Sequence, residues 1–569
     1  MKREKKDDKM KVIDELANVV GKRHVITSKE RSEQYREGYR SGHGDALAVI
    51  RPKTLLELWK VLEIVHKHDL IVIMQAANTG LTEGSVPNQN GYDRDVVVIN
   101  TLRMKGIQLI DYNQQVIVFP GTTLHGLETA LDKVDRNPHS VIGSSTIGAT
   151  VVGGVNNNSG GALIQRGPAY TELALYAQVD KNNELHLVNH LGVDLGTTPE
   201  EILTNLEEHN YNAQNVHYSE ERVGHNRNYE SRVRDVEADT PTRYNANPKE
   251  LYEVSGSAGK LVTFAVRLDT YPKPKAEKVF YIGTNDPAVL EKLRRHILTK
   301  FKYLPVSGEY MHREAYDLAK KYGKDNLMVI DDIGTKPLPF LFNARAASER
   351  ILHHIPTFKP YFVDRTLQKL SGIFPDQLPK RMEEFRDKYQ HYLQLKVDDQ
   401  GIQEASDYLQ EFFKDHEGGY FECTPKEAKV AATHRYVTAA VPIRYAETHQ
   451  DDDIQILPLD IALPRNEEDW FETLPKEIDD KIKYKLYYGH FLDHVMHQDY
   501  ILKKGVDPHE LKQEMLKILD KRGAKYPAEH NVGHLYHAPE NLVEHYKVCD
   551  PTNTFNPGIG ITSTKRDWK

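Results

Sequence analysis

The segments Gln75-Ala-Ala-Asn-Thr-Gly-Leu-Thr-Glu-Gly-Ser85 and Val152-Gly-Gly-Val-Asn-Asn-Asn-Ser-Gly-Gly161 decide the fold of this chain. Each is a loop of small residues that follows an apolar run. Small side chains allow backbone N–H groups to approach a phosphate closely. The spacing matches neither the Rossmann glycine pattern nor a P-loop. One such loop alone could be a tight surface turn, but two in this order favour a site for a phosphate-bearing cofactor.

The sequence around these loops predicts strands that alternate with helices, which is typical of an α/β unit. Thr54 is placed to cap a helix over 55–66, and the apolar run 70–74 is a buried strand that leads into the first loop. Further strands are predicted at 46–50, 96–99, 115–119 and 260–268, and further helices at 12–20 and 124–131. A Pro- and Lys-rich break at 271–275 ends this unit.

The second half of the chain predicts an α+β unit that a basic stretch interrupts. Strands are predicted at 279–282, 392–396, 454–457 and 461–463, and helices at 288–301, 402–415 and 508–523. The stretch from about 311 to 387 mixes cations with apolar residues. Between Lys336 and Lys369, six Lys and Arg residues oppose Glu349 and Asp364, a net charge of +4 within a chain of net −8. Such a stretch could dock on a membrane surface, although an ordinary basic helical domain has the same composition.

The composition excludes several classes of protein. A net charge of −8 and a pI near 6.4 argue against a nucleic-acid binder. Cys423 and Cys549 are far apart in the sequence, which fits a reducing compartment. The charged N-terminal segment lacks the apolar core of a signal peptide. No run approaches the roughly 20 apolar residues that span a bilayer, so we expect any membrane contact to be peripheral.

Histidines are dense in the segment Gly489-His-Phe-Leu-Asp-His-Val-Met-His-Gln-Asp-Tyr500. His490 and His497 would share one side of a helix, or lie on opposite faces of a strand unless a turn intervenes. Glu529 and His530 follow as a pair. Two His and one Glu are a common ligand set for a divalent ion, and a further His can accept a proton near neutral pH. On spacing alone, structural or solvated histidines explain this pattern at least as well.

Together these segments resemble the FAD-dependent D-2-hydroxyacid dehydrogenases, whose flavin domain is of the vanillyl-alcohol-oxidase (PCMH) type. That family carries a motif like G-H-x-G-D-G-N-x-H, then Glu-His-Gly, then D-P-x-x-x-x-N-P-G. Here these appear as Gly489-His490…His497, Glu529-His530-Asn531 and Asp550-Pro551…Asn556-Pro557-Gly558. The loops and motifs keep the family order across nearly the whole chain. Within this family, the chain most resembles the bacterial quinone-dependent D-lactate dehydrogenases. The resemblance rests on the first loop, on residues 138–145 and 165–172, and on the basic stretch.

The resemblance implies an α+β fold in three functional parts: a two-subdomain PCMH-type FAD-binding domain, an α+β cap domain for the substrate, and a helical, basic, membrane-binding insertion. The implied FAD-binding domain spans 1–268 and is completed by 520–569. The implied cap domain spans 269–310 and 388–519, and the insertion spans 311–387.

The resemblance also places FAD. It implies a diphosphate site at Ala76, Ala77, Asn78, Thr79, Gly80, Gly84 and Ser85. It implies that Gly143, Thr150 and Gly160 line the flavin and adenosine path, and that Val262 supplies a backbone contact. Relatives that tether flavin usually do so through a His or Cys near these loops. Neither residue type occurs in 75–85 or 143–161, so we expect non-covalent FAD.

The implied reaction is oxidation of D-lactate to pyruvate, with electrons passed to a membrane quinone of the respiratory chain. His530 is the implied base. Arginine binds carboxylates through two parallel hydrogen bonds, so Arg435 and Arg444 are the candidates for the substrate carboxylate. Either could equally form a surface ion pair. In several relatives the residues matching His490, His497 and Glu529 hold a divalent ion, here Zn²⁺ or Mn²⁺. The chain departs from the family motif between the two histidines and at Asn531.

The resemblance implies a peripheral membrane enzyme on the cytoplasmic side of the bacterial inner membrane, docked on an anionic phospholipid surface. Two other functions remain open. One is an FAD dehydrogenase of another D-2-hydroxy acid with a different acceptor. The other is a non-catalytic, flavin-binding, membrane-associated protein. Reduction of the flavin by D-lactate would separate them.

Overall fold

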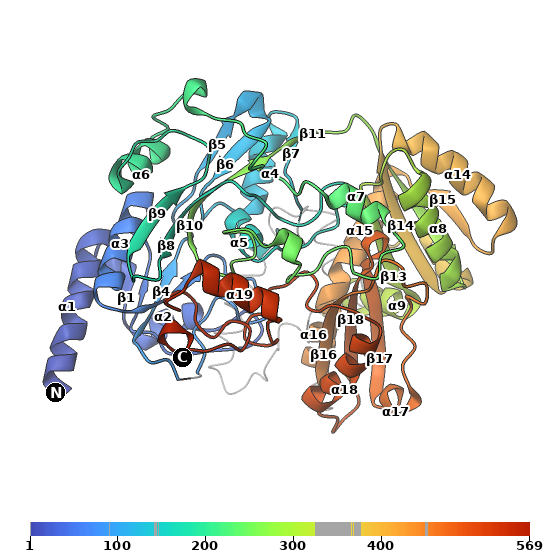
Figure 1. Ribbon diagram of the computed structural model, residues 1–569. Helices are drawn as coiled ribbons and strands as arrows, with labels where there is room; N and C mark the ends of the chain where they lie inside the picture. The colour runs from blue at the N-terminus through green and yellow to red at the C-terminus, as the bar shows by residue number, and fades with distance from the viewer. Residues whose placement is uncertain are drawn as a thin grey trace.

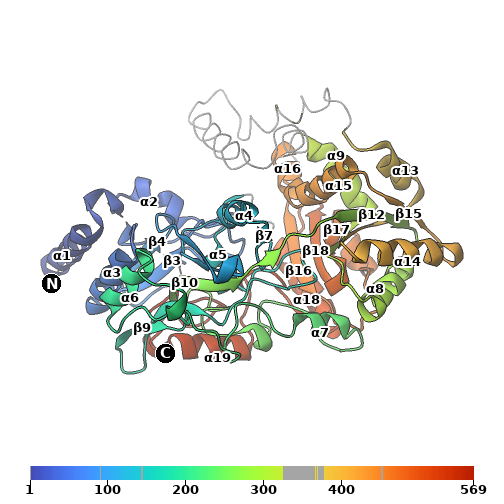
Figure 2. The same cartoon turned by 90° about the horizontal axis from the view of Figure 1, so that it is seen from above.

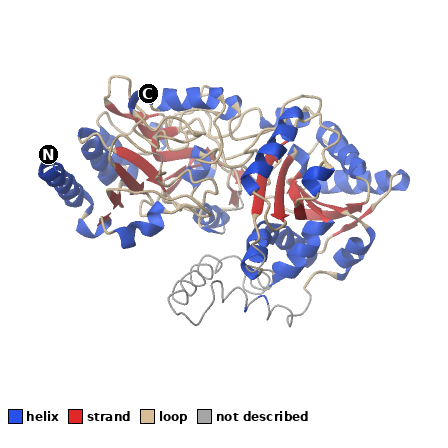
Figure 3. Ribbon diagram, turned by 90° about the horizontal axis from the view of Figure 1, so that it is seen from below, coloured by secondary structure: helices blue, strands red, loops and turns tan. Residues whose placement is uncertain are grey.

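The computed structural model describes residues 2–89, 91–141, 145, 147–324, 366, 368, 377–449 and 453–569. Two bodies lie side by side in all three overall views (Figures 1, 2 and 3). The first body is built around two small sheets, and the second body around one large sheet. Both chain termini lie on the first body (Figure 1). The chain therefore leaves the first body, forms the second, and returns.

The first body contains a four-stranded and a five-stranded sheet. The four-stranded sheet has the order β1-β2-β4-β3, with β2, β4 and β3 parallel and β1 antiparallel. Its strands are β1 (Val25–Ile26), β2 (Ala48–Ile50), β3 (Ile71–Gln75) and β4 (Val96–Asn100). The five-stranded sheet is antiparallel and has the order β5-β6-β10-β8-β9. Its strands are β5 (Ile107–Ile110), β6 (Gln115–Val118), β8 (Ala174–Val179), β9 (Leu185–Asn189) and β10 (Val262–Asp269).

The helices of the first body follow from local sequence signals. Thr54 caps α3 (Leu55–Lys67) by accepting a hydrogen bond from the Glu57 amide at 3.0 Å, which confirms the predicted start. Leu58 and Leu62 lie on one face of this helix and are buried against the sheet. The other helices are α1 (Lys2–Val20), α2 (Lys29–Arg36), α4 (Leu124–Asp132), α5 (Val151–Asn156), α6 (Pro199–Glu207) and α19 (Glu540–Cys549), beside the strand pair β7 (Arg136–Asn137) and β11 (Tyr271–Pro272). Helix α7 (Tyr229–Arg234) instead packs on α8 (Pro287–Lys300) of the second body.

The second body is a seven-stranded antiparallel sheet of order β15-β12-β14-β13-β17-β18-β16, with helices on both faces (Figure 3). Its strands are β12 (Glu277–Thr284), β13 (Ser307–His312), β14 (His391–Asp398), β15 (Gly419–Glu422), β16 (Ile456–Ala462), β17 (Ile482–His490) and β18 (Val495–Leu502). One face packs on α8 (Pro287–Lys300), α14 (Gly401–Asp415) and α18 (Pro508–Lys521). The other packs on α9 (Arg313–Tyr322), α13 (Lys380–Lys388), α15 (Pro425–Val437) and α16 (Val441–Thr448). Strand β12 shows the alternation, since Phe280 and Ile282 face the first set and Tyr281 the second.

One strand prediction was wrong. The sequence predicted separate strands at 454–457 and 461–463, but β16 (Ile456–Ala462) runs from the first segment into the second without a break. Pro458 lies in the middle of this strand. Strand β16 pairs only with β18 among the described strands, so it is an edge strand, where proline leaves no ladder hydrogen bond missing. The continuous strand carries Asp460, a buried carboxylate.

The last part of the chain packs on the first body. The Val72 amide donates to the Thr554 carbonyl at 3.1 Å, and the Asn556 amide donates to the Val72 carbonyl at 2.8 Å. Phe555 is buried in the same core as Val72. The C-terminal segment thus runs beside β3, the strand that leads into the first glycine loop.

The predicted insertion at 311–387 begins within β13 and also contains α9 and α13, which pack on the large sheet. Most of the remainder lies outside the described residues. This includes the six cations Lys336, Arg345, Arg350, Lys359, Arg365 and Lys369. In the part of the chain that the structure describes, no helix combines the length and apolarity needed to cross a bilayer.

Candidate functional site

A β-hairpin brings the two predicted histidines together. Strands β17 and β18 are joined by a 3₁₀ turn at Phe491–Asp493, and His494 has a left-handed backbone with φ of 56°. The register pairs His490 with Val495 and Tyr488 with His497. Val495 and His497 are two residues apart and share a face of β18. His490 and His497 therefore lie on the same face, because a turn intervenes.

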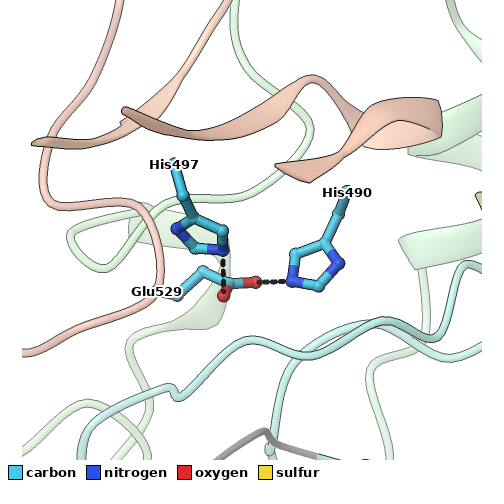
Figure 4. Close-up of side chains that lie close together, drawn as sticks. All are labelled: His490, His497 and Glu529. Atoms are coloured by element: carbon cyan, nitrogen blue, oxygen red, sulfur yellow. Dashed lines mark ion pairs between the residues drawn. The ribbon is translucent and has the colours of Figure 1, made fainter. Parts of the chain in front are cut away.

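Glu529 lies between these two rings (Figure 4). Its Oε1 is 3.3 Å from His490 Nε2, and its Oε2 is 3.5 Å from His497 Nε2. The three side chains are buried or half-buried, and their ligand-type atoms all lie within 4.8 Å of one another. The structure thus assembles the predicted metal-ligand set, from the hairpin of the second body and from the segment that returns to the first.

Two carboxylates that the sequence analysis missed hold the outer nitrogens of the imidazoles. Glu309 on β13 places Oε1 2.6 Å from His490 Nδ1. Asp460 on β16 places Oδ1 3.5 Å from His497 Nδ1 and Oδ2 2.7 Å from His530 Nδ1. The same Oδ2 accepts the Glu529 amide at 2.8 Å. The available signal was an acidic residue inside an apolar strand, as in Leu457-Pro-Leu-Asp-Ile-Ala462.

Arg243 is a second residue that the sequence analysis missed. It is 1% exposed and lies between two carboxylates. Its Nη2 is 2.5 Å from Glu529 Oε1, and its Nε is 2.8 Å from Asp493 Oδ2. Tyr229 also donates to Asp493 Oδ2, at 3.0 Å. Acidic and basic groups therefore alternate through the buried cluster, which lets several charges share one low-dielectric region.

This alternation shifts the pKa values of the cluster. Burial lowers the pKa of His490, but Glu309 and Glu529 raise it more, to about 10. Burial raises the pKa of Glu529, but His490 and Arg243 bring it well below the ordinary value. Burial alone would lower the pKa of His530, but the negative charge of Asp460 raises it above the ordinary value. Without a bound cation, His490 is protonated and Glu529 is ionised at neutral pH.

The two predicted arginines occupy different places. Arg435, on α15, is buried with Nη2 3.0 Å from Glu309 Oε2, and its guanidinium lies 4.6 Å from the centre of the Tyr488 ring. It therefore joins the cluster through Glu309. Arg444 is buried on the next helix, α16. For both residues, the role in binding a substrate carboxylate remains a prediction.

Both glycine loops meet the Glu529–Asn531 segment. Thr82 Oγ1 donates to the Asn531 carbonyl at 2.7 Å, and a Cβ added at Gly84 would lie 3.2 Å from Asn531 Nδ2. A Cβ added at Gly160 would collide with Glu529 Oε1, so this close approach requires glycine. The candidate site therefore lies where the loops of the first body meet the sheet of the second.

The remaining predicted cofactor residues lie in or near these loops. Ala76, Ala77, Asn78 and Thr79 are half-buried, and Gly80 is exposed with open space where a Cβ would be. Ser85 Oγ donates to Asn78 Oδ1 at 2.7 Å, which braces the first loop. Thr150 caps α5 by accepting from the Gly153 amide at 3.2 Å, and Val262 is buried at the start of β10. Gly143 lies outside the described residues. Open small-residue loops of this kind fit the diphosphate of FAD.

Comparison with known families agrees with this geometry. Residues 46–179 match a family described as FAD binding domain, and residues 279–568 match one described as D-lactate dehydrogenase, membrane binding. The first match contains both glycine loops. The second contains the hairpin, Glu529 and His530. The predictions of an FAD-binding protein and of a membrane-binding region are thereby confirmed.

Individual relatives cover the whole chain. The chain is 54% identical over 562 residues to a quinone-dependent D-lactate dehydrogenase of Escherichia coli (strain K12), covering 99% of this chain and 98% of that protein. It is 54% identical over 558 residues to one of Haemophilus influenzae, covering 98% and 99%. Among solved structures it is similar to an alkyldihydroxyacetonephosphate synthase at TM-score 0.58 and 12% identity, covering 96% and 84%. The predicted fold class, a PCMH-type FAD-binding domain with an α+β cap, is confirmed.

Proposed function

The chain belongs to the quinone-dependent D-lactate dehydrogenases, and on this basis we propose that His530 is the base that accepts the hydroxyl proton of D-lactate. The enzyme is an FAD flavoprotein that oxidises D-lactate and passes the electrons to a quinone. The observation that carries the proposal is the contact of His530 Nδ1 with Asp460 Oδ2 at 2.7 Å.

This contact determines which nitrogen of His530 can work as the base. The pKa of Asp460 is well below its ordinary value, because His530 and His497 outweigh the effect of burial. An ionised carboxylate accepts a hydrogen bond, so Nδ1 of His530 carries the hydrogen and Nε2 keeps its lone pair. Nε2 is then the atom that accepts the hydroxyl proton of the substrate.

Removal of that proton lets the C–O bond of D-lactate become the carbonyl of pyruvate. The chemistry that FAD would supply when bound is acceptance of a hydride, the hydrogen of Cα with its two electrons. The reaction thus takes two protons and two electrons from the substrate, and the proton on His530 is released to solvent. Asp460 orients the ring and stabilises its protonated form, as the carboxylate does in a Ser-His-Asp triad.

Anaerobic mixing of the purified flavoprotein with D-lactate tests the function. The visible absorbance of oxidised FAD should disappear with D-lactate and persist with L-lactate. Flavin that is reduced only by a longer D-2-hydroxy acid would favour the dehydrogenase of another substrate. Flavin that stays oxidised with every D-2-hydroxy acid would favour the non-catalytic alternative.

We also propose that His490, His497 and Glu529 can hold one divalent ion, Zn²⁺ or Mn²⁺. The Nε2 atoms of both histidines converge on Glu529, and each Nδ1 faces a carboxylate, as is common for histidines that bind metals. Arg243 already contacts Glu529 Oε1, so Oε2 is the freer ligand atom. Because the pKa of His490 is raised to about 10, an ion must displace its proton, and binding should weaken as the pH falls.

We further propose that the basic stretch docks on anionic phospholipid at the cytoplasmic face of the bacterial inner membrane. The support comes from the sequence, where the net charge between Lys336 and Lys369 is +4. Each cation near an anionic surface contributes about 1 kcal/mol, and salt screens this attraction. The match to a membrane-binding family spans this stretch.

A further inference from the structure

The loop at 159–169 extends the second glycine loop toward the second body. Its base is closed, because the Ala169 amide donates to the Ser159 carbonyl at 3.0 Å. Gly160 lies at this base, so close to Glu529 that a Cβ would not fit between them. Ile164 lies near the middle of the loop. The loop therefore leaves the first body and returns to it at one point, and Ile164 lies at its tip.

Ile164 is inserted into the second body. Its side chain is 0% exposed and belongs to the core on one face of the large sheet, together with Tyr310, Leu393 and Leu492. Its amide donates to the Val306 carbonyl at 3.0 Å. Ile164 thus contributes to a hydrophobic core that the other body builds, and withdrawal of the loop would return its side chain to water.

Gln165 adds polar contacts at the same place. Its Nε2 donates to the Leu304 carbonyl at 3.0 Å and lies 3.3 Å from Asp398 Oδ2. Hydrogen bonds are directional, whereas apolar burial alone is not. The backbone bond of Ile164 and the side-chain bond of Gln165 therefore fix the orientation of the tip on the second body.

The two ends of the loop reach both carboxylates that contact the first histidine of the hairpin. The base of the loop meets Glu529 through Gly160. The tip meets Val306 through Ile164, and Val306 directly precedes β13, the strand that carries Glu309. The insertion of Ile164 therefore connects the second glycine loop to two sides of the candidate site.

We propose that Ile164 is a positioning residue for hydride transfer, an assignment that rests on the proposed function. Its insertion into the second body holds the second glycine loop, with the predicted cofactor residues Thr150 and Gly160, at a fixed distance from His530. Reacting atoms must lie about 3–3.5 Å apart, and a displacement of about 1 Å can cost about 100-fold in rate. Ile164 acts through the placement of the loop, because its side chain lies in the core.

The test compares Ile164→Ala and Ile164→Val with the control Ile297→Ala, which removes the same atoms from a fully buried residue of α8 in the same core. Flavin reduction by D-lactate should be about 10- to 100-fold slower in Ile164→Ala, with the FAD content of the wild type. Ile164→Val should remain close to the wild type, because it removes one methyl group. Ile297→Ala should unfold at lower urea concentration but reduce its flavin at the wild-type rate. Rates are compared where circular dichroism shows every variant folded.

Two further measurements separate positioning from a general loss of stability. With D-lactate deuterated at Cα, the slow flavin reduction in Ile164→Ala should show at least the wild-type isotope effect, because the loss lies in hydride transfer. In the resting enzyme without substrate, the amides of 159–169 should exchange hydrogen faster in Ile164→Ala and not in Ile297→Ala. A smaller isotope effect, or unchanged exchange in this loop, would overturn the proposal.

The remaining outcomes are distinguishable. A wild-type rate of flavin reduction in Ile164→Ala, an equal fall in Ile297→Ala, or loss of FAD from Ile164→Ala would overturn the proposal. If Ile164→Ala does not fold, Gln165→Met decides, because Gln165 is half-buried and its replacement leaves the core intact. Its flavin reduction should also be slower than in the wild type, and an unchanged rate would overturn the proposal. Failure of D-lactate to reduce the wild-type flavin would instead refute the proposed function.

Discussion

Replacing Asp460 by Asn tests most directly whether Asp460 supports His530 as the base. The substitution removes one negative charge and keeps the shape of the side chain. Oδ2 of Asp460 accepts from His530 Nδ1 at 2.7 Å and from the Glu529 amide at 2.8 Å. A hydrogen bond to a charged group contributes about 1.5–3 kcal/mol, compared with about 1 kcal/mol between neutral groups. The lost difference of about 0.5–2 kcal/mol corresponds to a fall of about 2- to 30-fold in kcat/KM.

The same variant should also shift the pH dependence of kcat/KM in a direction that can be predicted. His530 works as a base only in its neutral form, so activity is lost as the pH falls through its pKa. Burial lowers that pKa, and Asp460 raises it above the ordinary value. Asp460→Asn removes the raising charge. The acid limb of kcat/KM should therefore move to lower pH in the variant.

A double-mutant cycle decides whether Asp460 acts through His530. His530→Ala should lower turnover by about 10²- to 10⁴-fold while FAD is retained. The double variant should then be no slower than His530→Ala alone, because the orienting group has lost its target. Asp415→Asn, at an exposed position on α14, is the matched control. The reasoning would be refuted if the acid limb did not move in Asp460→Asn. It would also be refuted if the turnover of the double variant fell by the product of the two single-variant factors.

Four further results are expected. Acid precipitation should release FAD into the supernatant, whereas flavin that stays in the pellet would mean a covalent link. Arg243→Met should lower the free energy of unfolding by about 3–5 kcal/mol in urea titrations, because Asp493 and Glu529 lose a buried partner; an unchanged midpoint would contradict this. Purified active enzyme should contain one Zn²⁺ or Mn²⁺ per chain that His497→Ala no longer retains, and fully active, metal-free protein would exclude the ion. Co-sedimentation with liposomes should need anionic lipid and weaken as salt rises, whereas equal binding to neutral vesicles would exclude the charge-based mode.

Sequence reasoning worked where the signal is local. The cap at Thr54 and the helix after it depend on residues within one turn, and both are confirmed. The glycine loops are contiguous, and their composition alone indicated a phosphate site. The strand that contains Pro458 was predicted as two segments, whereas the structure has one strand, and its place at the edge of the sheet allows the proline. Edge position is a property of the assembled sheet and cannot be read from the strand itself.

The carboxylates and the arginine of the site could not be predicted, for a related reason. Asp460 and His530 are 70 residues apart in the chain, and Arg243 and Glu529 are 286 apart. Each is brought to its partner by strand register or by the return of the chain to the first body. A buried charge in one strand gives no sign of which distant charge neutralises it. The histidine motif was visible because its members lie on one hairpin.

One of the positions where the chain departs from the family motif shows how the two bodies are joined. The family has glycine after Glu-His, and here the residue is Asn531. Its Nδ2 donates to Asn157 Oδ1 at 2.6 Å, and its Oδ1 accepts the Gly533 amide at 3.0 Å. Its carbonyl accepts from Thr82 in the first glycine loop. Asn531, the residue next to the proposed base, thus contacts both cofactor loops. Asp460 of the second body holds the His530 ring, and Asn531 fastens the backbone beside it to the loops of the first body. The position of the ring relative to these loops therefore depends on both bodies.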